Sequence, residues 1–402
     1  MRNVTRTEMS SGSFVIAAAR VVAEQGDFTP GIVEVARGRI ARVRGGRPPR
    51  GVRVRPGVLA PGLIDLQING CAGVDFVTFQ DPASLVGVRG HLLGTGVTGF
   101  LPTLITTPLP VLHQALRRWQ EVARAGGAPR VLGVHVEGPY LNPAFAGAHP
   151  IEHLRAPDAG EFTRILDEAP GLVRLFTLAP ELPGADGLIQ IGRKRRILLS
   201  AGHTGATCEQ ARQAFRSGMR MATHLFNAMR PLHHREPGIV GATLADDRVT
   251  AGLIADFVHV HPAVVRTVIA GKGWGRVALV TDAVAPAGED RDRVRARSSS
   301  LAGREVTVSD APRLPSGTLA GSLLTLDQAV RNVVSLGVPL RDAVLMASAV
   351  PAALLGRRDL GRIAAGARAD LVLFDRRLRV ETVYLAGIRV FERTGIPRRP
   401  TE

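Results

Sequence analysis

The stretch VLGVHVEGPYLN, residues Val131–Asn142, decides how this chain folds and what it does. Its opening run of apolar and β-branched residues is typical of a strand that is buried on both faces. The strand must end at Gly138-Pro139, because proline lacks the backbone N–H that a central strand needs. Glu137 is therefore the last side chain of the strand. A carboxylate at such a position is costly unless it is paired or bound to a metal ion.

Three later segments end in the same way. ILLSAGH ends at His203, MRMATHLFN contains His224, and VALVTD ends at Asp282. Each residue alone has an ordinary structural explanation, such as a hydrogen-bonded histidine or, for Asp282, a helix cap. Four such residues at equivalent strand ends instead favour one shared site, because the carboxyl ends of the strands of a barrel gather at one rim.

The order of apolar strands and helical patterns predicts the fold class. From Leu63–Ile68 onward, short apolar runs alternate with helical patterns over roughly 250 residues. Such alternation requires parallel strands joined by crossovers and predicts an α/β fold with a closed (β/α)8 barrel, an open doubly wound sheet being the alternative. The expected elements include the strands Gly99–Leu104, Val131–Val136, Val173–Leu178, Met221–Leu225 and Val277–Val280, and the helices Pro110–Arg124, Ala159–Asp167, Cys208–Ser217, Pro262–Ala270, Thr325–Leu336 and Leu340–Leu355.

Both ends of the chain have a different pattern. Phe14 to Leu59 and Gly361–Val390 consist of short β-like runs separated by glycine turns. We therefore expect a small discontinuous β-sandwich domain built from both chain ends, residues 1–60 and 356–402, with the barrel of residues 61–355 inserted between them. The charged, serine-rich stretch Asp290–Arg313 interrupts the barrel pattern and is expected to be a hairpin or a mobile excursion.

The amino-acid composition excludes several classes of protein. The 402 residues are 45% hydrophobic, and no window approaches 18 uninterrupted apolar residues, so we expect no membrane span and no signal peptide. The net charge of +16 comes almost entirely from arginine, with lysine only at Lys194 and Lys272. Because the basic residues are not interleaved with aromatics, we expect no nucleic-acid partner. Cys71 and Cys208 have no metal-ligand spacing and favour a reducing cytoplasm, a disulfide between them being the less favoured alternative.

The shared site has the composition of a metal centre. Two neutral imidazoles and a carboxylate suit Zn²⁺ or a similar divalent ion and leave an open position for water. A bound metal would lower the pKa of that water toward neutrality. Asp282 is not needed as a ligand and is free to accept the proton of the water and pass it to a leaving group.

From about Leu59 to the C-terminus, the chain resembles the N-acetylglucosamine-6-phosphate deacetylases, a family of the amidohydrolase superfamily. The resemblance rests on PGLIDLQING, HVEGPYLNP, GAH, SAGHTGAT, THLFNAM, REPG, LVTDA, GTLAGS and GRIAAGARADLVLFD, which are weak singly and specific together. It implies Glu137, His203 and His224 as metal ligands, Asp282 as the catalytic acid and base, and His149 beside the acetyl carbonyl. It also implies substrate-binding positions at Gln67, Ala148, Asn227, Ala228, Arg235, Asp256, His259, Leu319, Ala320 and Gly321.

One departure from many amidohydrolases concerns the number of metal ions. Where those proteins have His-x-His at the end of the first barrel strand, this chain has Gln67-Ile68-Asn69. Amides are poor ligands for transition metals. The resemblance is therefore to the mononuclear branch and implies one divalent ion per subunit, zinc, with Gln67 placed to hydrogen-bond the bound water or the substrate. The family is commonly dimeric, which implies a homodimer in which Arg235 reaches the neighbouring subunit's pocket.

The implied reaction is hydrolysis of the N-acetyl group of N-acetylglucosamine 6-phosphate to glucosamine 6-phosphate and acetate, in amino-sugar catabolism and cell-wall recycling. The galactosamine epimer differs at one ring hydroxyl and remains an alternative substrate. A cyclic-amide hydrolase is a weaker alternative, because such enzymes usually have His-x-His and a carbamylated lysine, and neither lysine here lies at a strand end. A nucleic-acid-binding barrel is the alternative of another class.

Overall fold

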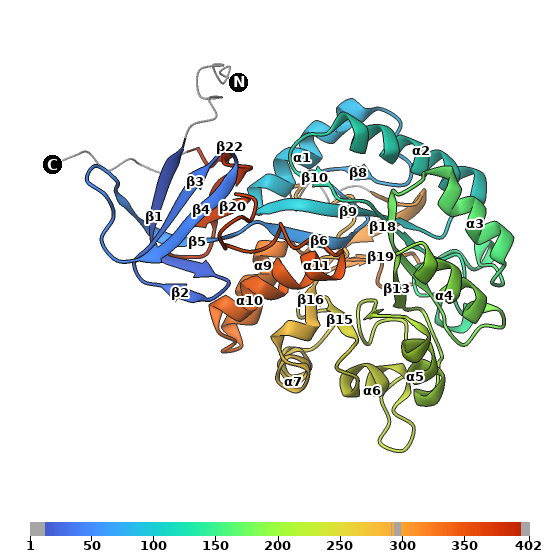
Figure 1. Cartoon of the computed structure of the whole chain (residues 1–402). Coiled ribbons are helices and arrows are strands. Elements are labelled where there is room, and N and C mark those ends of the chain that lie inside the picture. The colour runs from blue at the N-terminus through green and yellow to red at the C-terminus, as the bar shows by residue number, and fades with distance from the viewer. Residues whose placement is uncertain (1–12, 291, 293–298, 395–402) are drawn as a thin grey trace.

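The computed structural model describes residues 13–290, 292 and 299–394. Two sheets organise these residues (Figure 1). In the first, parallel strands follow one another in the order β6, β9, β11, β12, β13, β14, β15 and β16. Their bounds are β6 Leu63–Ile68, β9 Val97–Ile105, β11 Val134–Glu137, β12 Val173–Leu178, β13 Leu198–Ala201, β14 Met221–Ala222, β15 Thr250–Leu253 and β16 Val277–Leu279, with β10 Arg130–Val131 pairing beside β9.

The two ends of this sheet meet and nearly close a barrel. The backbone N–H of Asp282 donates to the carbonyl of Gln67 at 2.8 Å, and that of Asn69 donates to the carbonyl of Ala283 at 2.7 Å. The strands can lie at the centre because their side chains are apolar on both faces; every residue of β9, for example, is buried. The closure brings the residues that follow β16 against the end of β6.

Helices cover the outside of the barrel (Figure 1). Most are amphipathic and bury one apolar face against the strands. The helix α5 begins with a capping box in which Thr207 and Gln210 satisfy each other's backbone N–H groups. The helices are α1 Leu85–Gly94, α2 Leu109–Ala125, α3 Ala159–Glu168, α4 Ala185–Lys194, α5 Cys208–Ser217, α6 Gly238–Ala245, α7 Pro262–Lys272, α9 Leu326–Ser335, α10 Leu340–Met346 and α11 Ala349–Leu354.

The second sheet unites the two ends of the chain, drawn in blue and red at the left of Figure 1. Its central strand β5 pairs parallel with β1 and antiparallel with β20, and the core beside it includes Ile16, Leu59 and Leu371. The strands are β1 Phe14–Ala23, β2 Gly26–Phe28, β3 Gly31–Ala36, β4 Arg39–Gly45, β5 Val54–Pro61, β20 Leu371–Phe374, β21 Val380–Leu385 and β22 Ile388–Glu392. The predicted fold class is confirmed, whereas the division into domains at residues 60 and 355 stays a prediction.

The structure differs from the sequence prediction in detail. The helix expected over Leu340–Leu355 is two helices, and α4, α6 and β15 were not predicted. Part of Asp290–Arg313 is the expected hairpin, formed by β17 Ser299–Leu301, β18 Arg304–Val308 and β19 Pro312–Arg313; residues 291 and 293–298 lie outside the described residues. Within the described part of the chain, no helix has the length and hydropathy needed to cross a membrane.

Candidate metal-dependent active site

The four strand-end residues predicted from the sequence meet at the carboxyl rim of the barrel. Glu137 is the last residue of β11, and His203, His224 and Asp282 follow β13, β14 and β16. The last three have positive φ angles of 49°, 28° and 51°. Left-handed backbone is unfavourable for these residue types and concentrates at functional sites. The chain thus turns sharply at each strand end and directs each side chain toward the barrel axis.

Three of these side chains form a triangle of donor atoms. Glu137 Oε1, His203 Nε2 and His224 Nε2 are each 3.1 Å from the other two. Bonds of 2.0–2.2 Å to a tetrahedral metal ion separate its ligand atoms by about 3.3–3.6 Å. The triangle is therefore close to one face of a tetrahedral metal site. The three side chains are also buried, which suits a closed ligand set.

Electrostatics favour a cation at this point. Burial by itself would raise the pKa of Glu137, but hydrogen bonds and charge from His203 and His224 hold it well below its usual range. Burial likewise lowers the pKa of His224, and the contact with Glu137 outweighs it, so the pKa of His224 is raised. A proton on His224 thus compensates the buried carboxylate, and a divalent ion would replace it.

Hydrogen bonds outside the triangle orient two of the imidazoles. His203 Nδ1 lies 3.1 Å from the carbonyl of Phe145, which favours a proton on Nδ1 and leaves Nε2 as a metal donor. His149 Nδ1 lies 2.8 Å from Thr106 Oγ1 and 3.3 Å from the backbone N–H of Thr106, and acceptance from this N–H favours a neutral His149 with its proton on Nε2. Burial lowers the pKa of His149 well below its usual range and keeps the ring neutral.

His149 also lies close enough to be considered as a ligand. Donor atoms of Glu137, His149 and His203 fall within 4.8 Å of one another. His224 fits the third position of such a triangle better than His149, because its Nε2 atom is 3.1 Å from both other donors.

The two amides found in place of a His-x-His motif hold the carboxylates. Gln67 Nε2 donates to Glu137 Oε2 and to Asp282 Oδ1, at 3.2 Å in each case. Asn69 Nδ2 donates to Asp282 Oδ1 at 2.7 Å. Burial and the charge of Glu137 raise the pKa of Asp282 to about 6. Asp282 is therefore oriented by two donors and suited to exchange protons near neutral pH.

The pocket above these residues has a volume of about 260 Å³. Six of the substrate-binding positions implied by the resemblance line it: Ala148, Asn227, Ala228, His259, Leu319 and Gly321. Four do not. Gln67 and Ala320 are fully buried, and Asp256 supports His259 through a contact of 2.7 Å between Oδ2 and Nδ1. Arg235 is exposed on the loop before α6 and does not enter the pocket of its own chain.

The structure adds lining residues that were not singled out as substrate contacts. Leu301 comes from the β17–β19 hairpin, which Arg304 fastens to the pocket wall by donating to the carbonyl of Ala148 at 2.6 Å. Thr318, Ile105 and Gly147 complete the wall. Gly147 and Thr318 lie within the motifs GAH and GTLAGS, whereas no local sequence signal marks Leu301 and Ile105 as pocket residues, because their contribution depends on tertiary packing.

Asp65 is a buried acid that sequence reasoning also missed. It accepts hydrogen bonds from Thr281 Oγ1 at 2.6 Å and from the backbone N–H of Gln67 at 3.2 Å. It therefore braces the segment that carries Asp282. Burial, stronger than these hydrogen bonds, raises the pKa of Asp65 from 3.8 to about 7. Between those pH values the folded chain retains a proton that the unfolded chain has lost, so this group lowers the free energy of unfolding as pH rises.

We expect Asp65→Asn to stabilise the protein at pH 8, by at most about 4 kcal/mol, with the advantage shrinking toward pH 4. The asparagine does not titrate, and its oxygen can accept the same backbone N–H groups. Urea unfolding of both proteins between pH 4.5 and 8 measures the difference. If the variant is less stable than the wild type by the same amount at every pH, the altered hydrogen bonding and packing at residue 65 determine its stability, and the removed charge does not.

Comparison with known proteins agrees with this geometry. The amidohydrolase family matches residues 58–395, and the chain belongs to that family. N-acetylglucosamine-6-phosphate deacetylase of Bos taurus is 41% identical over 352 residues, which cover 83% of this chain and 84% of that protein. N-acetylgalactosamine-6-phosphate deacetylase of Escherichia coli O157:H7 is 38% identical, covering 93% of this chain and 98% of that protein.

A solved structure is similar over almost the whole chain. It is a mutant N-acetyl-D-glucosamine-6-phosphate deacetylase from Mycobacterium smegmatis in complex with N-acetyl-D-glucosamine 6-phosphate. It is 34% identical, has a TM-score of 0.89, and covers 94% of this chain and 99% of that chain. Because 94% of this chain is covered, the structural similarity includes both the barrel and the second sheet.

Proposed function

We propose that this protein hydrolyses the N-acetyl group of N-acetylglucosamine 6-phosphate to glucosamine 6-phosphate and acetate. The observation that carries the proposal is the buried triangle of Glu137, His203 and His224, with Asp282 and His149 beside it. The two relatives and the solved structure, which are named for deacetylation of amino-sugar 6-phosphates, support this substrate class.

Each residue of the site has a separate role in the proposed reaction. Glu137, His203 and His224 would hold the metal ion, which when bound supplies a water of lowered pKa. Asp282 accepts the proton of this water as it attacks the acetyl carbonyl, and later donates a proton to the departing amine. The Nε2–H of His149 donates to the carbonyl oxygen as negative charge develops there. Gln67 and Asn69 keep the Asp282 carboxylate oriented throughout.

We further propose zinc as the ion and the cytoplasm as the compartment. Two imidazoles and one carboxylate are typical ligands of catalytic zinc, which keeps an open coordination position. Both Cys71 and Cys208 are free thiols, as a reducing compartment favours. Metal analysis of protein purified from its native host would identify the ion.

Acetate release tests the proposed function directly. The substrates to compare are N-acetylglucosamine 6-phosphate, its galactosamine epimer and unphosphorylated N-acetylglucosamine, each before and after metal removal. We expect metal-dependent turnover of the phosphorylated sugars, with the epimer ratio deciding between the two activities named for the relatives. Absence of turnover with metal verified as bound would refute the proposed function.

A homodimer would explain the exposed position of Arg235. Its guanidinium contacts only the neighbouring His234 among the described residues, yet its planar fork suits a phosphate. We propose that it enters the pocket of a second subunit. Arg235→Ala is then expected to raise the KM for the phosphorylated sugar about tenfold or more, as the loss of a charge-assisted contact predicts, with a smaller change in kcat.

The exposed Arg212 on α5 offers a matched control, because it is an arginine that does not line the pocket of the active site. Arg212→Ala should leave KM unchanged, and sedimentation should show a dimer for both variants. An unchanged KM in Arg235→Ala would show that this residue does not bind the phosphate.

A further inference from the structure

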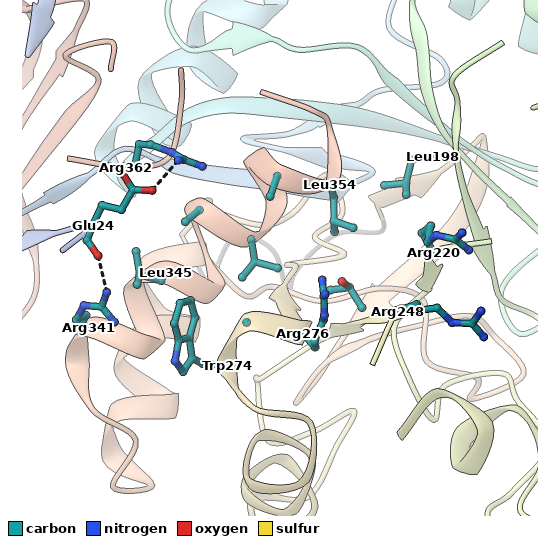
Figure 2. Close-up of a pocket in the computed structure, with 15 residues that line it drawn as sticks. Glu24, Leu198, Arg220, Arg248, Trp274, Arg276, Arg341, Leu345, Leu354 and Arg362 are labelled. Atoms are coloured by element: carbon teal, nitrogen blue, oxygen red, sulfur yellow. Dashed lines mark hydrogen bonds and ion pairs between the residues drawn. The ribbon is translucent and has the colours of Figure 1, made fainter. Parts of the chain in front are cut away.

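A second cavity, of about 480 Å³, lies at the opposite end of the barrel from the active site (Figure 2). Its floor consists of residues at the amino-terminal ends of consecutive strands: Leu198 begins β13, Arg220 precedes β14, Thr250 begins β15, and Arg276 precedes β16. The helices α10 and α11 form the facing wall. The catalytic rim does not use this cavity, and this end of a barrel ordinarily serves stability alone.

Positive charge gathers around this cavity. Five arginines and a single acid, Glu24, line it. Glu24 is already engaged, because Arg362 donates to its carboxylate at 2.7 Å and Arg341 donates to its carbonyl at 2.9 Å. The remaining arginines are Arg220, Arg248 and Arg276.

Of these three, only Arg248 has a carboxylate partner, Asp246 at 2.6 Å. The Arg220 side chain donates to backbone carbonyls, and the Arg276 guanidinium makes no hydrogen bond or ion pair with another described residue. The buried Nε atoms of Arg341 and Arg362 also lack acceptors there. The cavity therefore presents uncompensated charge and unused donors to one small volume.

The other half of the cavity is apolar and aromatic. Leu198, Leu345 on α10 and Leu354 on α11 all line the cavity (Figure 2). Trp274, in the turn Trp274–Arg276, lies at the same wall, and the Arg341 guanidinium stacks on its ring at 5.5 Å from the ring centre. An inorganic anion would leave this surface unused, whereas a flat aromatic group would cover it.

We propose that this cavity binds a nucleoside phosphate as an effector. The phosphate would lie beside Arg276, whose guanidinium fork matches phosphate oxygens in pairs, with the positive charges of Arg220 and Arg248 at the same floor. The base would lie against Trp274 and the leucine wall. The volume falls within the range of small-molecule sites.

The strands connect this cavity to the catalytic residues. Each of three strands joins a cavity residue to a catalytic-rim residue: β13 runs from Leu198 toward His203, β14 follows Arg220 and precedes His224, and β16 follows Arg276 and precedes Asp282. Four to six residues separate the members of each pair, a span of about 13–20 Å in an extended strand. A ligand that restricts the motion of the amino-terminal ends of these strands could thus change kcat or KM of the active site at their carboxyl ends.

Calorimetric titration of the metal-loaded protein tests the binding site without depending on turnover. The probes are AMP, GMP and UMP, with adenosine and inorganic phosphate as the separated parts. We expect one nucleotide per chain, bound at least about tenfold more tightly than either part. Nucleotide should also change the tryptophan fluorescence, and Trp274→Phe should remove that signal, because the other tryptophan, Trp119, is fully buried in the barrel core.

Two variants distinguish binding in this cavity from non-specific attraction of the nucleotide to a positively charged protein. Arg276→Glu should weaken nucleotide binding at least about tenfold, since it replaces a charge-assisted donor by a repelling carboxylate. Arg266→Glu changes an exposed arginine on α7 and should have no effect. Absence of binding by all three nucleotides, equal weakening by both variants, or equally tight binding of phosphate alone would each overturn the proposal. Binding that leaves acetate-release kinetics unchanged would refute the effector role.

Discussion

Asp282→Asn is expected to lower kcat for acetate release by about 1,000-fold while leaving metal content unchanged. In the proposed mechanism Asp282 acts twice, as base and then as acid, and an amide can do neither. It lies outside the 3.1 Å triangle of donor atoms, so the ligand set stays intact. The measurements are steady-state acetate release and metal content after dialysis at fixed free zinc.

The same residue sets the acid side of the pH profile. Asp282 must be ionised to accept the proton of water, so kcat/KM should fall as pH drops through its pKa, which is about 6 without metal and which a bound cation moves lower. Asp247→Asn, a change at an exposed carboxylate beyond α6, serves as the control. Near-normal kcat in Asp282→Asn would assign the proton transfers to another group.

Glu137→Gln is expected to remove the metal ion and, with it, activity. Glu137 is the anionic member of the triangle and contacts both histidines at 3.1 Å. Changes to groups that only orient ligands cost roughly 10–100-fold in metal affinity, so losing the charged ligand itself should cost more than roughly 100-fold. Competition with a zinc chelator measures the affinity, and acetate release in excess zinc measures the activity that remains.

An exposed glutamate of the same loop region provides the comparison. Glu152→Gln makes the same chemical change near the pocket without touching the triangle and should retain metal and activity. Full metal content in Glu137→Gln would mean that His149, whose donor atom lies in the same cluster, can complete the ligand set.

Much of the site was predictable because each ligand lies where an apolar strand stops. A run of buried residues that ends on glutamate, histidine or aspartate is a local signal, and barrel geometry brings such ends together. The loop residue His149 was found only through the resemblance of its motif. Arg235, implied in the same way, does not line the pocket of its own chain, and its role in a second subunit stays a prediction.

By itself, the sequence determined the α/β class, the barrel with a second sheet from both chain ends, and the candidate site residues Glu137, His203 and His224, because periodicity and strand ends are local properties. Only the tertiary structure decided how Gln67 and Asn69 orient Asp282, that Thr106 contacts His149, and that five arginines from separate segments surround one cavity at the far end of the barrel. These features depend on hydrogen bonds and packing between segments distant in the chain, and such contacts leave no pattern in the order of residues.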